Sequence, residues 1–355
     1  MEKKSIEALI NDIQKMSIWE FAFLFQKLQL KNLGAFKALH KIKAHKGIVR
    51  RILFCKLGKS KNLYLISCGV DKLIQIWDVT TSVLFKTLEG HRHHVYKLMI
   101  IKHNKTPYLC SSSSDRTIKI WSLKTFKLTK SLIGHTSTPY SMLFIKKKKL
   151  LVSGDWDGNL IFWNLNLGTM LLSIKTYLNE IWSLYYDERI SCLIVGSRAS
   201  DKLSFYDMKA RAFTQEFKIN EFTNPNFVKF IFEIDSIKIH PDINEFLICS
   251  GSNNVALINK DYSLKQFSVL KGHSNQVRSF VFCKKLNFLI TASCDRRVRI
   301  WKMEFDKNNN KLVIKEEENL ESPHTDNINC VAIDEDENYL ATCSWDGEIL
   351  IYSLN

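Results

Sequence analysis

The sequence contains few residues that interrupt regular structure, and it has no long apolar run. Its 355 residues include only five prolines and thirteen glycines, which excludes collagen-like and low-complexity chains. No apolar run reaches the roughly 18–20 residues that a membrane-spanning helix needs. The N-terminal MEKKSIEALIND is too polar for a signal peptide. We therefore expect an intracellular protein, either cytoplasmic or nuclear.

The nine cysteines are odd in number and include no Cys-x-x-Cys pair. They support neither a disulfide framework nor a zinc site. Hydrophobic residues make up 45% and charged residues 25% of the chain, which is enough apolar material for a large core. The net charge of +15 comes mostly from lysine in a chain rich in Asn, Ile and Phe. Because an AT-rich genome produces the same bias, the charge alone does not indicate a nucleic-acid partner.

One pattern recurs five times along the chain, in DKLIQIWD (71–78), DRTIKIWS (115–122), DGNLIFWN (157–164), DRRVRIWK (295–302) and DGEILIYS (346–353). In each copy a His, a Ser or Thr, an Asp and an aromatic residue follow one another at nearly constant spacing. The members of this pattern are His45, Ser67, Asp71 and Trp77; His91, Ser111, Asp115 and Trp121; His135, Ser153, Asp157 and Trp163; His273, Thr291, Asp295 and Trp301; and His324, Thr342 and Asp346.

Two degenerate copies fill the gap between the third and the last two. One places Tyr177 at the His position and Tyr206 at the aromatic position, and the other has Phe230 at the His position but neither the Asp nor the Trp. Within each copy, apolar and polar residues alternate with period two, and turn residues separate the short segments. This pattern indicates four β-strands per copy.

The repeat resembles the WD-repeat β-propeller family over about residues 36–355. The resemblance implies an all-β, seven-bladed propeller (34–355) in which the Asp accepts a hydrogen bond from the His, while Ser or Thr and Trp complete a buried polar network. The fourth and fifth blades should rely more on apolar packing. Since the chain ends after the third strand of its last copy, residues 34–43 should supply the closing strand of blade 7.

Residues 1–33 precede the repeat and have the pattern of two amphipathic helices. We interpret them as a helical arm folded onto the propeller; dimerisation or partner docking is the functional alternative. The spacing of Ile10, Ile13, Trp19 and Phe25 is weakly similar to the LisH dimerisation motif, although Ile18 stands where that motif has Gly.

No catalytic or cofactor-binding pattern stands out. Ser, His and Asp recur once per copy at structural spacing, whereas a catalytic triad occurs once. The histidines of residues 90–94 lack a nearby carboxylate or Cys that would complete a metal site. Phosphate-binding glycine loops and His-Glu-x-x-His motifs are also missing from the sequence. We therefore predict a protein that is not an enzyme and needs no cofactor or metal.

Two candidate binding surfaces follow from the family's loop arrangement. The residue five positions after each repeat His should lie near the mouth of the central channel. In two copies, the turn between the second and third strands (the b–c turn) should add a tryptophan. The predicted partner-binding residues are Arg50, Tyr96, Tyr140, Trp182, Asp235, Arg278, Trp156 and Trp345. Aromatic residues and Arg are typical anchors of protein interfaces.

The opposite face should carry a crescent of lysines, called the basic face below. Its residues are Lys56, Lys59, Lys61, Lys102, Lys105, Lys124, Lys127, Lys146, Lys147, Lys148 and Lys149. RNA or an acidic protein is the partner that this charge would suit.

From these patterns we predict a WD-repeat scaffold for protein–protein interactions within a multisubunit complex. RNA binding in ribonucleoprotein assembly, such as ribosome biogenesis or mRNA processing, is one alternative. A ubiquitin-ligase substrate receptor is another, although Trp77-Asp78-Val79-Thr80 lacks the final Arg of the Trp-Asp-x-Arg signature of that class.

Overall fold

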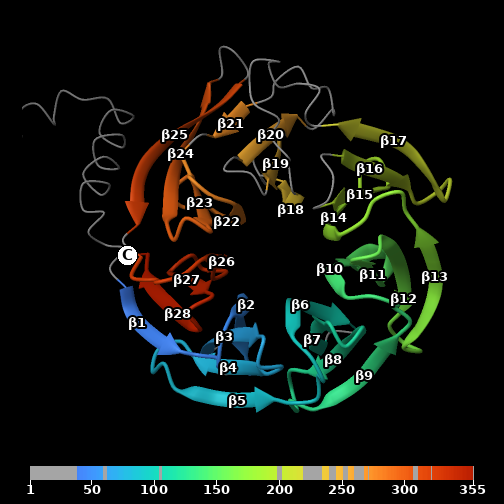
Figure 1. The fold of residues 1–355 in the computed structure, drawn as a ribbon, viewed down its shortest axis with the longest axis horizontal. Coiled ribbons are helices and arrows are strands. Elements are labelled where there is room, and N and C mark those ends of the chain that lie inside the picture. Colours follow the sequence, from blue (N-terminus) through green and yellow to red (C-terminus); the bar gives the residue numbers. More distant parts are fainter. Residues whose placement is uncertain are drawn as a thin grey trace, which may run out of the picture.

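The structure is a computed structural model. It describes residues 38–58, 62–103, 106–197, 202–218, 234–239, 245–250, 255–259, 268–270, 272–306, 311–320 and 322–354. These residues form seven four-stranded antiparallel sheets, arranged as blades around a central opening (Figure 1). Six blades are each built from four consecutive strands, and the seventh sheet joins the two ends of the ring.

In each of the six consecutive blades, the first strand is innermost and the next three follow it outward in chain order (Figure 1). Blade 1 comprises β2 (Val49–Leu57), β3 (Asn62–Gly69), β4 (Ile74–Asp78) and β5 (Leu84–Leu88). Blade 2 comprises β6 (Val95–His103), β7 (Thr106–Ser113), β8 (Thr117–Ser122) and β9 (Leu128–Ile133). Blade 3 comprises β10 (Pro139–Ile145), β11 (Leu150–Asp155), β12 (Asn159–Asn164) and β13 (Thr169–Lys175).

The second half of the ring repeats this order. Blade 4 comprises β14 (Ile181–Asp187), β15 (Cys192–Ser197), β16 (Lys202–Asp207) and β17 (Ala212–Lys218). Blade 5 comprises β18 (Ile234–Ile239), β19 (Glu245–Ser250), β20 (Val255–Asn259) and β21 (Ser268–Leu270). Blade 6 comprises β22 (Val277–Cys283), β23 (Phe288–Ser293), β24 (Val298–Asp306) and β25 (Lys311–Leu320).

The closing sheet combines both ends of the described chain. It contains β26 (Ile328–Ile333), β27 (Tyr339–Ser344), β28 (Glu348–Ser353) and, on its outer side, β1 (Ala38–Lys43). β1 runs antiparallel to β28, with Ile42 opposite Ile349. The backbone N–H groups of Ala44 and His45 also donate to the carbonyl oxygen of Gly347. β1 therefore covers an edge of β28 that would otherwise present unpaired backbone groups.

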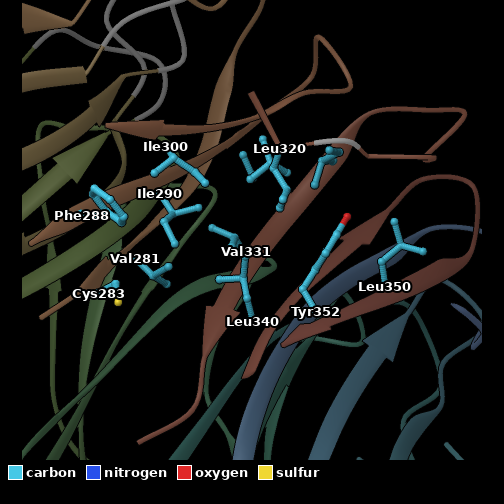
Figure 2. Packing of buried hydrophobic residues seen from close by; sticks show 13 residues of the cluster. Val281, Cys283, Phe288, Ile290, Ile300, Leu320, Val331, Leu340, Leu350 and Tyr352 are labelled. Carbon is cyan, nitrogen blue, oxygen red and sulfur yellow. The ribbon is translucent and has the colours of Figure 1, made fainter. Parts of the chain in front are cut away.

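The core consists of apolar side chains pressed between neighbouring blades. Between blades 6 and 7, Phe288 and Ile290 pack in one cluster with Leu340 and Tyr352 (Figure 2). All four are fully buried, and burying a side chain of this size contributes about 1.5–3 kcal/mol. Every residue of β23 is buried, because blades pack on both of its faces.

The predicted fold class is wrong in its helical part. The residues on which the arm was predicted, 1–33, lie outside the described residues, and the described ranges contain no α-helix. Their only helical element is a 3₁₀ turn at Lys146–Lys148. The fold is therefore an all-β propeller, because its sheets bury their apolar faces against one another without a helical layer. Across the described ranges, no helix has the length and apolar character needed to cross a membrane.

Candidate functional site

Four blades contain the predicted polar network in the same geometry. In blade 2, His91 Nδ1 lies 2.8 Å from Asp115 Oδ2, and His91 Nε2 lies 2.8 Å from Ser111 Oγ. The indole N–H of Trp121 donates to Ser111 Oγ at 2.8 Å. Blades 1, 6 and 7 repeat the His–Asp and His–hydroxyl contacts at distances of 2.7–2.9 Å. Each of these networks joins the His that precedes the inner strand of the blade to the Asp in the turn between its second and third strands.

Blade 3 corrects one predicted member of the network. His135 Nδ1 contacts Asp155 Oδ2 at 2.9 Å, whereas the predicted Asp157 is exposed. Asp155 is completely buried and also accepts hydrogen bonds from the backbone N–H and the side-chain amide of Asn159, at 2.7 and 3.0 Å. The cause is the sequence Asp-x-Asp, which offers two carboxylates two residues apart. The one on β11 reaches His135, so the one in the turn stays in solvent.

These hydrogen bonds favour the ionised form of the aspartates. Burial alone would raise the pKa of Asp295, but the hydrogen bond and charge of His273, together with backbone N–H donors, lower it to about 2. The same causes hold the pKa of Asp71, Asp155 and Asp346 below the usual value. Each carboxylate therefore stabilises the fold at neutral pH.

Blade 4 replaces the network with apolar contacts. Tyr177, predicted at the His position, is 92% exposed and takes no part in it. The buried Val195 stands where the other blades have the network Ser or Thr, and Tyr206 lies opposite Leu193 as Trp163 lies opposite Leu151. Phe230 and most of blade 5's predicted network positions lie outside the described residues.

A β-bulge at the start of each inner strand positions the channel-mouth residues. Each strand shows a register shift around its second residue, as between Val95 and Lys97 of β6 and between Pro139 and Ser141 of β10. The residues at these seven bulges are Arg50, Tyr96, Tyr140, Trp182, Asp235, Arg278 and Asn329. A bulged residue is left out of the ladder, so its side chain can be turned in a new direction.

The aromatic side chains of blades 2, 3 and 4 touch one another across the blade boundaries. Tyr140 stacks on Trp182 with ring centroids 4.5 Å apart and planes at 10°. Tyr96 meets Tyr140 edge-on at 4.7 Å, and Trp156 lies against Tyr140 at 5.6 Å. Trp156 remains 43% exposed. The predicted grouping of these four residues is thus present as one continuous aromatic surface.

Arg50 extends this surface into blade 1. Its guanidinium lies 4.9 Å from the ring centroid of Tyr96 and 5.9 Å from that of Trp345. The indole N–H of Trp345 donates to Asn329 Oδ1 at 2.7 Å, which ties that tryptophan to the channel wall. Burial lowers the pKa of Arg50, Tyr96 opposes this effect, and the positive charge of Arg278 lowers the pKa further.

A small pocket of about 50 Å³ opens beside these side chains. Arg50, Arg51, Lys97 and Arg278 line it together with Tyr96, Tyr140, Trp182 and Asn329. Arg278 also donates from Nε to Cys294 Sγ at 3.2 Å. The side chain of Asp235 lies outside the described part of blade 5, although its backbone is on β18. The described lining is therefore basic and aromatic.

The basic face is only partly free of acidic neighbours. Lys146, Lys147, Lys148 and Lys149 are all exposed. Lys147 forms an ion pair with Glu188 of blade 4 at 2.5 Å. The remaining described members include Lys56, which pairs with Asp336 across the boundary between blades 1 and 7, and Lys102, Lys124 and Lys127, which are exposed. Lys59, Lys61 and Lys105 lie outside the described residues.

One group in the described part of the chain has metal-ligand spacing. Single ligand atoms of His324, Asp346 and Glu348 lie within 4.8 Å of one another. However, His324 and Asp346 bond each other in the blade 7 network, and Glu348 pairs with Lys41 at 2.8 Å. Their geometry is fully explained by the blade.

The sequence reasoning missed one surface feature, the outer strand of blade 3. Met170, Leu171 and Leu172 of β13 are 48%, 58% and 41% exposed, and Leu167 is 72% exposed. The signal was present in the sequence, because residues 158–174 contain no charged side chain. Apart from Lys175 at its end, this edge strand carries no charge, whereas β1 carries both Lys41 and Lys43.

The ring of four-stranded blades, the repeated His–Asp–hydroxyl networks and the blade-to-blade core define a β-propeller built from sequence repeats. Residues 36–78, 82–122, 126–164, 264–302 and 317–353 match the family described as WD domain, G-beta repeat. These matches cover more than half of the chain, and the protein belongs to the WD40 family. Propellers of this family generally act as non-enzymatic interaction scaffolds, and no finding points to catalysis.

Curated relatives match only short stretches. A stretch of 57 residues is 44% identical to Protein TOPLESS from Arabidopsis thaliana and covers 16% of this chain and 5% of that protein. Another of 66 residues is 35% identical to the Arabidopsis thaliana protein named Non-functional target of rapamycin complex subunit LST8-2, covering 19% of this chain and 20% of that one. The chain thus spans at most a fifth of the length of these relatives.

Proposed function

We propose that the protein is a scaffold that binds partner proteins at the channel mouth, as a subunit of a larger complex. The observation that carries this proposal is the continuous aromatic surface formed by Tyr96, Tyr140, Trp182 and Trp156. Aromatic side chains held rigidly at a surface lose little conformational entropy on binding, and they dominate the energy of many interfaces.

One further observation supports this surface as the binding face. Bulge residues of blades 1 to 4, 6 and 7 line one pocket, so a single partner segment can contact several blades. One partial relative, of which 20% is covered, is named Non-functional target of rapamycin complex subunit LST8-2; this likeness supports only the proposed membership of a complex.

The test is affinity purification of partners with the wild-type protein and with a Tyr140→Ala, Trp182→Ala double variant. Truncating a central aromatic anchor costs about 2 kcal/mol or more, roughly thirtyfold in affinity. The matched control is Phe85→Ala, because Phe85 is an exposed aromatic residue on the outer strand β5. Partners that survive the double variant as well as they survive the control would contradict the proposal.

RNA binding at the basic face is the second candidate function. It rests on the four consecutive exposed lysines, Lys146 to Lys149, although the ion pair with Glu188 reduces the free charge of one of them. Changing all four to Glu should slow association and flatten the salt dependence of binding if the ligand is RNA. Purification with and without nuclease separates RNA-bridged partners from directly bound proteins.

A further inference from the structure

The channel-mouth pocket combines basic side chains with an aromatic wall. Four of its eight described lining residues are cationic, namely Arg50, Arg51, Lys97 and Arg278, and none of the eight is acidic. A pocket of about 50 Å³ has room for one small group rather than a whole side chain and its backbone. The chemistry of that group is set by the charges that face it.

Arg50 brings a buried hydrogen-bond donor without an acceptor to this pocket. Its guanidinium carbon lies over the rings of Tyr96 and Trp345, but its buried Nε atom has no hydrogen-bond partner. Arg50 takes part in no ion pair within the described residues. A buried donor without an acceptor is destabilising, so a ligand that supplies an acceptor is favoured.

Arg278 places a second positive charge near Arg50 at this pocket. Its charge acts unfavourably on Arg50, so the ring holds two guanidinium groups of the same sign near one opening. Like charges brought together in a partly buried site are stabilised when an anion binds between or beside them.

The aromatic wall by itself would also suit a cationic ligand, such as a methylated ammonium group. The guanidinium of Arg50, which takes part in no ion pair within the described residues, argues against that occupant because it would repel a cation. An anionic group is attracted by Arg50 and can accept a hydrogen bond from its Nε–H, and the carbon skeleton that carries it can pack on the stacked rings of Tyr140 and Trp182.

We propose that the channel mouth binds an acidic segment of a partner protein and that the pocket takes one of its anionic groups, a carboxylate or a phosphate, against Arg50 and Arg278. This inference rests on the proposed function and names the chemistry of the segment that the scaffold recognises. Arg50 and Arg278 should supply the charge contacts, and the aromatic wall should supply the apolar contact area.

The test measures binding of three fluorescent peptides by anisotropy: octaglutamate, a Ser-Gly repeat carrying phosphoserine, and octalysine. The full-length protein should bind at least one of the two anionic peptides and not octalysine. Arg50→Gln and Arg278→Gln should each weaken that binding at least tenfold. Arg50→Lys, which keeps the charge, should retain more affinity than Arg50→Gln. Comparison of the two anionic peptides distinguishes a carboxylate from a phosphate.

The matched control is Arg211→Gln, since Arg211 is exposed in the turn between β16 and β17 and does not line the pocket. A second control changes Lys146 to Lys149 to Glu, which shows how much of the binding comes from the basic face. Equal affinity of Arg50→Gln and Arg211→Gln for the anionic peptides would overturn the proposal, as would loss of binding only in the lysine variant. Far-ultraviolet circular dichroism checks that each variant is folded.

Partner purification separates this inference from the function on which it rests. If the Tyr140→Ala, Trp182→Ala variant loses partners while Arg50→Gln and Arg278→Gln keep them, the channel mouth is the binding face but its ligand is not anionic. If all of these variants keep their partners, the proposed function fails as well.

Discussion

Replacement of Asp155 tests the blade 3 network, because the repeat pattern and the structure assign its carboxylate to different residues. Asp155 is fully buried and accepts three hydrogen bonds, one from His135 and two from Asn159. Asp157 is exposed. If each lost hydrogen bond costs about 1 kcal/mol, Asp155→Ala should lower the free energy of unfolding by about 3 kcal/mol. Asp157→Ala should change it by less than about 0.5 kcal/mol.

The measurement is urea unfolding followed by tryptophan fluorescence and circular dichroism, with coincident transitions required before a free energy is extracted. A double-mutant cycle between Asp155→Ala and Asn159→Ala should give a coupling energy of roughly 1 kcal/mol, because the two side chains bond each other directly. The reasoning is refuted if Asp157→Ala destabilises the protein as much as Asp155→Ala does.

Three further predictions concern turns, pH and ring closure. Gly158→Ala should be strongly destabilising, since a Cβ there would lie 1.7 Å from a backbone carbonyl oxygen. At Gly168 the nearest atom to an added Cβ would be in a flexible lysine side chain, at 3.3 Å, so Gly168→Ala should cost about 1–2 kcal/mol for its positive φ. Equal melting temperatures of the two variants would contradict this. The pKa of Asp295 is lowered to about 2 in the fold, so its contribution to the free energy of unfolding is fully present above about pH 4 and is lost as the pH falls through about 2. Urea unfolding at several pH values should therefore show that Asp295→Asn loses less stability in acid than the wild-type protein does. The same loss in both proteins would count against this prediction. Deleting residues 1–43 removes β1 and should abolish cooperative thermal unfolding, because β28 then loses its partner strand. Deleting residues 1–36 keeps β1 and should preserve cooperative unfolding. Cooperative unfolding of both shortened proteins would disprove closure of the ring by β1.

The sequence predicted the propeller because its polar networks recur with a fixed order and spacing. His91, Ser111, Asp115 and Trp121 lie where the repeat pattern indicates, since a buried polar group must find a partner at a fixed place in each blade. In blade 3 the same rule was satisfied by a neighbouring aspartate. Choosing between two carboxylates two residues apart requires knowing which one lies on the strand, and no spacing rule gives that.

The channel mouth was predicted by position along the repeat, but its contacts were not. The bulges that turn Tyr140 and Trp182 into a stack are backbone irregularities without a residue signature. The contact of Arg50 with Tyr96 and Trp345 joins residues far apart in the chain. The exposure of Tyr177 likewise depends on the local path of the chain, which lets a large aromatic leave the position that His takes in other blades.

Closure of the ring by β1 has a consequence for the order of events during synthesis. β1 leaves the ribosome roughly 300 residues before its partner β28. At about 5–20 residues per second, it remains without that partner for about 15–60 seconds. Blades 1 to 6 can form meanwhile from local hairpins, but the join between β1 and β28 is the most non-local contact in the described ring and must come last. During that interval β1 and the open flank of the nascent blades are strand edges that a chaperone can bind or another chain can capture.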